Sequence, residues 1–376
     1  MSEQHPPILI FAQSGRFLAQ EAIQAGYNTV WVADCFADLD LQTVASRWSK
    51  LPPFSQLDPL NLLNYLTKLA QDEPCQLICG SGIEQFYPVL SQLPENILLI
   101  GNTAATINII KTPSLFFPLL SQLNLPYPET QFERPKIKDN WLVKSMVGMG
   151  GEHIQPLGQA ELPENIYFQH YINGTSASAL FLADGQKALL LTINTQWLAP
   201  CENSPYRLGG IETPFELSAT NQQLLESAIN CISNSTGLLG LNSIDFIITA
   251  EDELLFLEVN PRLSASCELI ADRVPILQYH INACNGQLPD IKIYSSEKKH
   301  VLQYVYAAST LTIPETIIWP EQCHDLPETG TLIEVGQPVC TIRVMGDNSA
   351  DCQHRLEQIY NKVNVLLSCH YSSSKL

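Results

Sequence analysis

Positive charge is scarce in this chain, and this limits the kinds of ligand it can bind. Its 376 residues include 20 lysines and arginines against 38 aspartates and glutamates, for a formal net charge of −18. Such an acidic surface repels phosphate backbones and anionic headgroups, which disfavours nucleic acid and membranes as partners. An anionic ligand must therefore be met by a local cluster of cations.

Signals for secretion, membrane insertion and zinc binding are also lacking. The N-terminal residues MSEQHPPILIF have neither the basic start nor the long apolar core of a signal peptide. No run of about eighteen apolar residues occurs, so no transmembrane helix is expected. The 11 cysteines form no Cys-x-x-Cys pair and no zinc-ligand spacing. We therefore expect reduced thiols and a cytoplasmic protein.

Short apolar segments near the N-terminus predict a parallel sheet. Helical patterns separate these segments, which lie at 8–12, 28–34, 75–79 and 97–102. Ligands of such sheets bind beyond the carboxyl ends of the strands. The residues at those ends fit plain strand–helix turns and substrate contacts equally well; they are Ser14, Gly15, Arg16, Asp34, Gly80, Gly82 and Glu84. Because no Gly-x-Gly-x-x-Gly fingerprint is present, a dinucleotide cofactor is disfavoured.

The rest of the sequence predicts more antiparallel structure. Residues 103–125 read as helical, with breaks at Pro113 and Pro118, and 218–236 read as a helix. Strands are expected within 140–157, 165–174, 176–198 and 243–260, and Asp184-Gly185 is a strong hairpin turn. The C-terminal part alternates short strands and ends in a helix near 350–367. No repeat or low-complexity linker is visible, so we expect the domains to share interfaces.

Lys144 lies inside the apolar strand WLVKSM, where a lysine is costly unless an anion meets it. Gly148, Gly150 and Gly151 follow, and glycines let backbone N–H groups approach a phosphate closely. The segment is therefore a candidate phosphate-binding site. The alternative is a hairpin turn beside a lysine whose ammonium group reaches solvent.

The segment LFLEVNPRLSAS places Glu258, Asn260 and Arg262 at alternate positions, so their side chains would share one face of a strand. Pairing across the turn at 250–253 would bring Asp245 close to them. These oxygen ligands suit Mg²⁺, which would relieve the repulsion between the carboxylates. The alternative is a strand end with a solvated Glu and Arg, followed by an Asn-Pro turn.

The order of these features resembles the ATP-grasp ligases, over most of the chain and most strongly over 105–266. The resemblance rests on the N-terminal sheet, Lys111, Lys144 with its glycines, the strand YFQHYI, Asp245, and the Glu-x-Asn-x-Arg run. The segments AQSGR, AGYNTVWVADCFADLDL, GSGIE, IGN and PVCTI are similar to predicted ATP-dependent carboligases related to biotin carboxylase.

The resemblance implies an α/β ATP-grasp fold with three parts. Residues 1–102 would form a Rossmann-like domain and 103–170 a helical linker with a small β-rich lid. Residues 171–376 would form the large mixed catalytic domain with a terminal extension.

The resemblance also implies roles for individual residues. Lys111 and Lys144 would contact the ATP phosphates, with Lys144 also near the adenine edge, and Gly148, Gly150 and Gly151 would form a mobile lid. The main chain of His170 and Ile172 would bind adenine, whereas Gln169 stands where family members often carry an acid. Asp245, Glu258 and Asn260 would hold Mg²⁺ or Mn²⁺, and Arg262 would stabilise the transferred phosphoryl group.

Arg207, in SPYRLGGIETP, is a further catalytic candidate that would bring a cation to the acceptor carboxylate. The alternative is an exposed loop with a surface arginine. The eight histidines show no ligand spacing and read as surface or core residues.

The implied activity is an ATP-dependent carboxylate–amine or carboxylate–thiol ligase that works through an acyl phosphate. Its substrates would be small molecules, and a homodimer is left open. The carboligase resemblance suggests biosynthesis of a one-carbon cofactor. The alternatives are an ATP-grasp kinase or carboxylase-like enzyme with a non-amine acceptor, and a non-catalytic ATP-binding module.

Overall fold

The N-terminal part of the computed structural model is a parallel sheet of five strands in the order β3-β2-β1-β4-β5. The model describes residues 5–136, 140–146, 148–158, 162, 164–291 and 296–368. The strands are β1 (Ile8–Ala12), β2 (Val30–Asp34), β3 (Arg47–Lys50), β4 (Cys75–Cys79) and β5 (Ile97–Leu99). Every residue of β1 and β2 is buried, as expected of a parallel sheet covered on both faces. The prediction of a parallel sheet is confirmed.

Helices and 3₁₀ turns connect these strands. They are α1 (Arg16–Gln24), α2 (Leu41–Val44), η1 (Phe54–Gln56), α3 (Pro59–Ala70), α4 (Ile83–Phe86) and η2 (Tyr87–Gln92). The side chain of Asp58 caps α3 by accepting a hydrogen bond from the N–H of Leu60.

Two helices follow, α5 (Ala104–Lys111) and α6 (Pro113–Gln122). The break at Pro113 is confirmed, but the predicted break at Pro118 is wrong because this proline lies inside α6. The loss of one backbone donor is offset by the packing of Phe116, Phe117 and Leu120, which are all buried.

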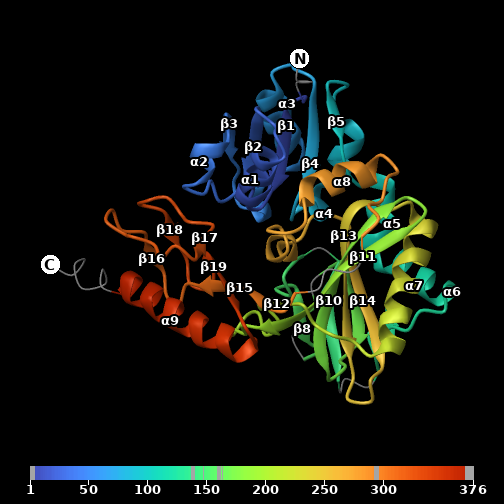
Figure 1. Cartoon of the computed structure of the whole chain (residues 1–376). Coiled ribbons are helices and arrows are strands. Elements are labelled where there is room, and N and C mark those ends of the chain that lie inside the picture. Colours follow the sequence, from blue (N-terminus) through green and yellow to red (C-terminus); the bar gives the residue numbers. More distant parts are fainter. Residues whose placement is uncertain are drawn as a thin grey trace.

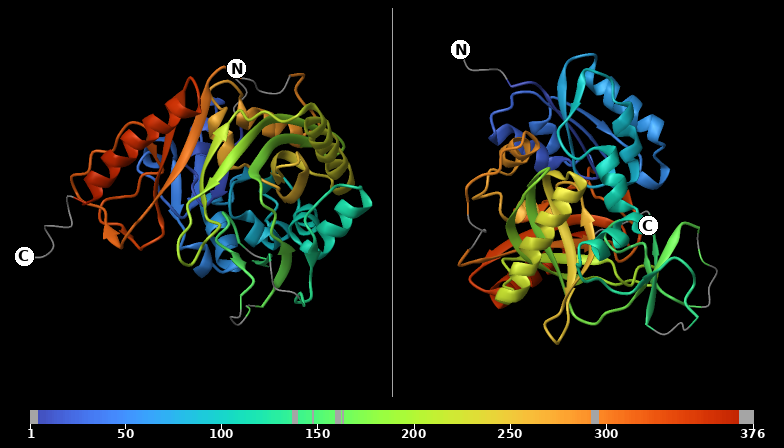
Figure 2. Two further views of the ribbon diagram at one scale, coloured as in Figure 1. Left: turned by 90° about the horizontal axis from the view of Figure 1, so that it is seen from below. Right: turned by 90° about the vertical axis from the view of Figure 1, so that its right-hand side faces the viewer.

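A small four-stranded sheet comes next, in the order β6-β9-β7-β8. Its strands are β6 (Thr130–Gln131), β7 (Trp141–Ser145), β8 (Ile154–Pro156) and β9 (Ile166–His170). Figure 2 shows these strands projecting from the body of the molecule beside α6.

The largest sheet has eight strands in the order β14-β13-β10-β11-β12-β15-β19-β17, and all its pairs are antiparallel. The strands are β10 (Thr175–Asp184), β11 (Ala188–Leu198), β12 (Leu208–Thr213), β13 (Leu239–Ile248), β14 (Leu254–Asn260), β15 (Lys299–Tyr306), β17 (Cys323–His324) and β19 (Pro338–Gly346). Both predicted hairpins, β10–β11 and β13–β14, are confirmed. The remaining elements are η3 (Ala265–Leu269), β16 (Leu311–Thr312), β18 (Leu332–Ile333), α7 (Ala219–Thr236), α8 (Ile276–Cys284) and α9 (Ser349–Ser368).

One apolar core joins the N-terminal sheet to the eight-stranded sheet. It contains Ile8 and Ile10 of β1, Leu180 of β10, Leu241 of β13 and Leu277 of α8. Figure 1 shows α8 between the N-terminal sheet and the eight-stranded sheet. The expectation of shared interfaces is confirmed. In the described part of the chain, no helix has both the length and the apolar character needed to cross a membrane.

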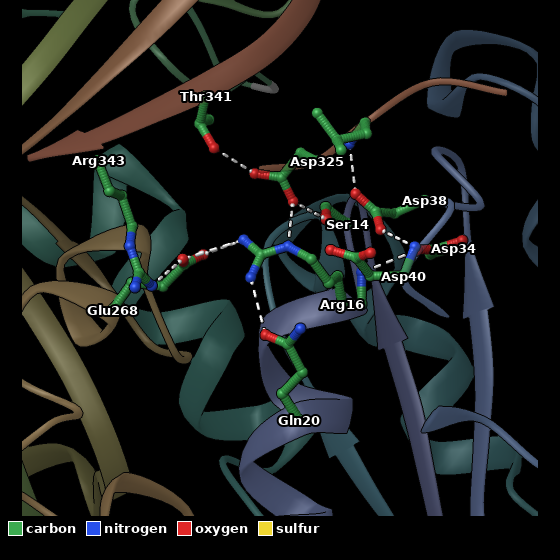
Figure 3. Close-up of polar contacts among 12 residues, drawn as sticks. Ser14, Arg16, Gln20, Asp34, Asp38, Asp40, Glu268, Asp325, Thr341 and Arg343 are labelled. Atoms are coloured by element: carbon green, nitrogen blue, oxygen red, sulfur yellow. Dashed lines mark hydrogen bonds and ion pairs between the residues drawn. The ribbon is translucent and has the colours of Figure 1, made fainter. Parts of the chain in front are cut away.

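A buried ion-pair cluster also connects these parts (Figure 3). Arg16, at the start of α1, is 0% exposed. Its guanidinium lies 3.0 Å from Glu268 Oε2 and 3.2 Å from Asp325 Oδ1. Arg343 Nη1 contacts the same Glu268 oxygen at 3.0 Å, and Ser14 Oγ donates to Asp325 Oδ1 at 2.6 Å. The strand-end residues Ser14 and Arg16 thus bind other parts of the protein.

Candidate active site

Antiparallel pairing of β13 and β14 brings the predicted metal ligands together. Asp245 lies opposite Glu258, and Ser243 lies opposite Asn260. Asn260 Nδ2 donates a hydrogen bond to Asp245 Oδ2 at 3.0 Å. Val259, between the two predicted ligands on β14, is buried in the apolar core. Glu258 and Asn260 therefore lie on the opposite face of the strand, as their alternation predicts.

Lys111, the last residue of α5, contacts both of these β14 side chains. Its Nζ donates to Glu258 Oε2 at 2.7 Å and to Asn260 Oδ1 at 3.4 Å. Burial raises the pKa of Glu258, but the charges of Lys111, His153 and Lys144, with the Lys111 hydrogen bond, together hold it below the ordinary value. Burial and the charge of Glu258 together raise the pKa of Asp245. The site thus favours a cation at these oxygens.

The donor set fits Mg²⁺ or Mn²⁺. Two carboxylates and an amide bind metal ions through oxygen atoms, which hard divalent cations prefer. Among the described residues, no group of three or more His, Cys, Asp or Glu side chains is placed to hold a metal. A metal here would therefore share its coordination sphere with ligand phosphates and water, as magnesium usually does.

Lys144, on β7, is 6% exposed. Its Nζ donates to Gln169 Oε1 at 2.7 Å, and Gln169 Nε2 donates to Thr130 Oγ1 at 3.1 Å. Burial lowers the pKa of Lys144 to about 8, although the negative charges of Glu258 and Asp245 act to raise it. An amide cannot neutralise an ammonium group, so the lysine remains able to bind an anion. The alternative of a lysine reaching solvent is wrong.

The glycine loop after β7 contacts the chain that leads into β12. Gly150 and Gly151 have φ values of +61° and +77°, a region that favours glycine. A Cβ at Gly151 would overlap the carbonyl oxygen of Tyr206, and Leu208 N–H donates to Gly150 O at 2.9 Å. Gly148, with φ +156°, packs against the side chain of His153. The loop therefore lies against residues 206–208.

His153 is a site residue that the sequence reasoning missed. Its Nδ1 is buried and has no hydrogen-bond partner within the described ranges. Burial lowers the pKa of this imidazole, which lies within electrostatic reach of Glu258 and Lys144. Its position two residues after the glycine run was the signal that could have singled it out from the other histidines.

The predicted adenine-binding residues lie at and beyond the end of β9. The His170 ring packs edge-on against Trp141, with centroids 5.6 Å apart. The backbone N–H of His170 donates to Glu129 O at 2.8 Å, so a ligand would have to use its carbonyl. Ile172 follows two residues later, just outside the small sheet.

Arg207 is buried, so the alternative of a surface arginine is wrong. Its Nε and Nη1 donate to Ala199 O at 2.9 Å and Gly336 O at 2.8 Å, and its guanidinium stacks 3.7 Å from the Tyr306 ring centroid. These contacts connect three segments of the large sheet region. A role toward the acceptor carboxylate stays a prediction.

Arg262 lies where the large sheet meets the N-terminal sheet. Its Nε donates to Glu84 Oε1 at 2.6 Å, an interaction that spans 178 positions of sequence. Burial lowers the pKa of Arg262, but the negative charges of Glu84, Asp245 and Glu258 raise it more. Three carboxylates therefore act electrostatically on one guanidinium, and Glu84 forms the hydrogen bond with it. Glu84 was left open from the sequence, and the structure assigns it this partner.

Comparisons with known proteins concern the domain and the fold of the chain. Residues 115–266 match a family model described as ATP-grasp domain. An uncharacterized protein of Methanocaldococcus jannaschii is 23% identical over 302 residues, which cover 76% of this chain and 73% of that protein.

Solved structures share the architecture at low identity. The biotin carboxylase domain of Hydrogenobacter thermophilus 2-oxoglutarate carboxylase, in complex with MgADP and bicarbonate, has a TM-score of 0.73 at 12% identity, covering 93% of this chain and 89% of that one. N5-carboxyaminoimidazole ribonucleotide synthetase from Thermotoga maritima has a TM-score of 0.68 at 13% identity, covering 94% and 98%. L-amino acid ligase from Bacillus licheniformis has a TM-score of 0.69 at 13% identity, covering 96% and 98%.

Proposed function

We propose that this chain, which has the ATP-grasp fold and carries an ATP-grasp domain over residues 115–266, is an ATP- and Mg²⁺-dependent ligase that joins a carboxylate to an amine. The observation that carries the proposal is the set of oxygen ligands across β13 and β14, flanked by Lys111 and Arg262. A non-catalytic module has no need to keep this whole set. A thiol acceptor would use the same first step.

The reaction divides into two transfers. A carboxylate oxygen of the first substrate attacks the γ-phosphorus of ATP, the bond to the bridging oxygen breaks, and ADP leaves. The amine nitrogen then attacks the carbonyl carbon of the acyl phosphate, phosphate leaves, and the nitrogen loses a proton. Both steps require positioning and charge stabilisation more than covalent catalysis by the protein.

The residues of the chain supply that positioning. Bound Mg²⁺, held by Asp245, Glu258 and Asn260, would neutralise phosphate charge. Lys111 and Lys144 would bind phosphate oxygens, and their burial strengthens these contacts. The glycine loop would close over the nucleotide and exclude water that would hydrolyse the acyl phosphate.

A carboxylating enzyme is the second candidate. The observation that favours it is the bicarbonate in the structurally similar biotin carboxylase domain, since bicarbonate is itself a carboxylate donor. An organic acid is the substrate class that the name of L-amino acid ligase suggests. The same residues of this chain would serve either acid.

Hydroxylamine can distinguish these acids because it traps organic acyl phosphates as hydroxamates. We expect ATP, Mg²⁺ and the correct organic acid from a panel to yield ADP and hydroxamate in equal amounts. ADP release that depends on bicarbonate, without hydroxamate, would favour the carboxylating enzyme. If ATP and Mg²⁺ neither raise the melting temperature nor yield ADP with any acid, the proposal is wrong.

The first variant to test is Glu258→Gln. Glutamine keeps the size of the side chain but removes one negative charge from the metal site, so ATP turnover should fall on the order of a hundredfold or more. Glu253→Gln is the matched control, because Glu253 lies exposed in the turn that joins the same two strands. Near wild-type turnover of Glu258→Gln, with the fold confirmed by circular dichroism, would mean that Glu258 is not a metal ligand.

A further inference from the structure

Glu84 holds its carboxylate in a fixed position at the end of the N-terminal sheet. Oε1 accepts the Arg262 Nε hydrogen bond at 2.6 Å, and Oε2 accepts from the Gly82 N–H at 3.0 Å. The exposed fractions of the two side chains are 6% for Glu84 and 12% for Arg262. Both carboxylate oxygens are therefore used inside the protein.

The turn that carries Glu84 is itself tightly packed. Gly82 has φ +107°, and a Cβ at this position would overlap the ring of Phe54. Phe54 in turn packs against Phe11 of β1 and Phe86 of α4, with ring centroids 5.6 Å and 5.3 Å away. Rigid packing of this kind fixes the direction from which Glu84 meets Arg262.

Only part of the Arg262 guanidinium is committed to the protein. Nε is bound to Glu84, and Nη1 donates to Leu263 O at 3.3 Å. Within the described residues no protein acceptor is found for Nη2. Nη2 and the second N–H of Nη1 therefore stay available to an anion, while Nε is occupied.

Asp245 and Glu258 also attract Arg262. Without a third carboxylate, the guanidinium would be free to turn toward these two metal ligands and compete with Mg²⁺. An ion pair with Glu84 at 2.6 Å is the stronger local interaction and holds Nε on the side of the N-terminal sheet.

We infer that Glu84 is a positioning residue, which orients Arg262 from the N-terminal sheet so that its terminal nitrogens meet the oxygens of the transferred phosphoryl group. This inference rests on the proposed function. It makes the N-terminal sheet a part of the reaction centre. It also assigns Glu84 a second task, which is to keep Arg262 away from the metal-binding oxygens.

The test uses the full-length chain with Glu84→Gln and Glu84→Asp. Glutamine keeps the shape and one acceptor but loses the charge, whereas aspartate keeps the charge on a shorter side chain. We expect Glu84→Gln to lower kcat on the order of tenfold or more, leave the KM for ATP within about twofold, and raise the Mg²⁺ concentration for half-maximal turnover. Glu84→Asp should recover part of the loss.

A matched control is Glu73→Gln. Glu73 also accepts an arginine hydrogen bond at 2.6 Å, from Arg47, but this pair lies on the surface of the same sheet domain. The Glu73→Gln variant should leave kcat and the Mg²⁺ requirement unchanged. Circular dichroism and melting temperatures establish that each variant is folded.

A double-mutant cycle separates positioning from a general structural role. If Glu84 acts through Arg262, then Glu84→Gln should cause no further loss of kcat in an Arg262→Met background. Additive losses, or normal turnover of folded Glu84→Gln, would overturn the inference. If the wild type turns over no ATP, the proposed function fails. The inference about Glu84 is then tested by ADP binding. If the Mg²⁺ dependence of ADP binding is the same in Glu84→Gln as in the wild type, the inference is overturned.

Discussion

The hydrogen-bond partner of the buried Lys144 is an amide, which supplies no countercharge. Gln169 is 1% exposed and satisfies the lysine Nζ without a countercharge, so burial lowers the pKa of Lys144 to about 8 from 10.5. Phosphate groups bind the protonated lysine. Below about pH 8, Lys144 is already protonated in the nucleotide-free protein. Above that pH, binding of a phosphate must be accompanied by uptake of a proton, so nucleotide affinity falls as pH rises.

We predict that the affinity for MgADP, measured by calorimetry from about pH 7 to 9.5, is level at first and then falls about tenfold per pH unit above the pKa of Lys144. In Gln169→Glu the affinity should begin to fall at a higher pH, because a carboxylate raises the pKa of the adjacent lysine. In Lys144→Met this fall in affinity should disappear. Identical profiles for the wild type and Gln169→Glu would contradict this account.

The glycine loop is the element whose function depends most on backbone conformation. Gly151 combines φ +77° with close contact to the carbonyl of Tyr206, whereas a Cβ added at Gly158, in the same small-sheet region, would meet open space. Substituting alanine at Gly151 therefore forces the loop away from residues 206–208, and the same change at Gly158 does not.

We predict that Gly151→Ala lowers ATP turnover on the order of tenfold or more, since closure over the nucleotide is disturbed, while Gly158→Ala remains near wild type. Hydrogen exchange supplies the second measurement. Nucleotide should protect the described loop amides at 148–153 in the wild type, and this protection should be reduced in Gly151→Ala. Equal protection in both proteins, with and without nucleotide, would refute the role of the loop as a lid.

At the scale of the whole molecule, Arg16 connects the N-terminal sheet to two later segments. Its contacts with Glu268 and Asp325 are buried, so removing the arginine leaves two carboxylates without their main countercharge. Glu268 of η3 is part of this cluster and is also bound by Arg343.

We predict that Arg16→Met destabilises the fold by about 3–5 kcal/mol, the usual cost of breaking a buried ion pair. Urea unfolding followed by fluorescence and circular dichroism gives the measurement. Arg355→Met is the control, because the Arg355–Asp351 pair is exposed on α9 and exposed ion pairs contribute little to stability. Equal losses for the two variants would show that the cluster does not stabilise the interface.

Local sequence patterns determined much of the architecture and of the candidate site. Apolar runs predicted β1, β2, β4 and β5, and turn residues predicted the β10–β11 and β13–β14 hairpins. Register across a short hairpin follows from its turn, so Asp245, Glu258 and Asn260 could be placed together from the sequence. The segment between β2 and β4 gave no prediction, since the edge strand β3 is short and polar, with alternating half-buried and exposed residues.

The tertiary structure alone decided which distant residues meet. Glu84 and Arg262 are 178 positions apart, Lys111 and Glu258 are 147 apart, and Arg16 and Asp325 are 309 apart. Periodicity and turn chemistry act over a few residues, whereas these contacts depend on how the N-terminal sheet and the eight-stranded sheet pack together. The sequence by itself therefore determined which ligands and cations the chain carries, and packing decided the partners that orient them.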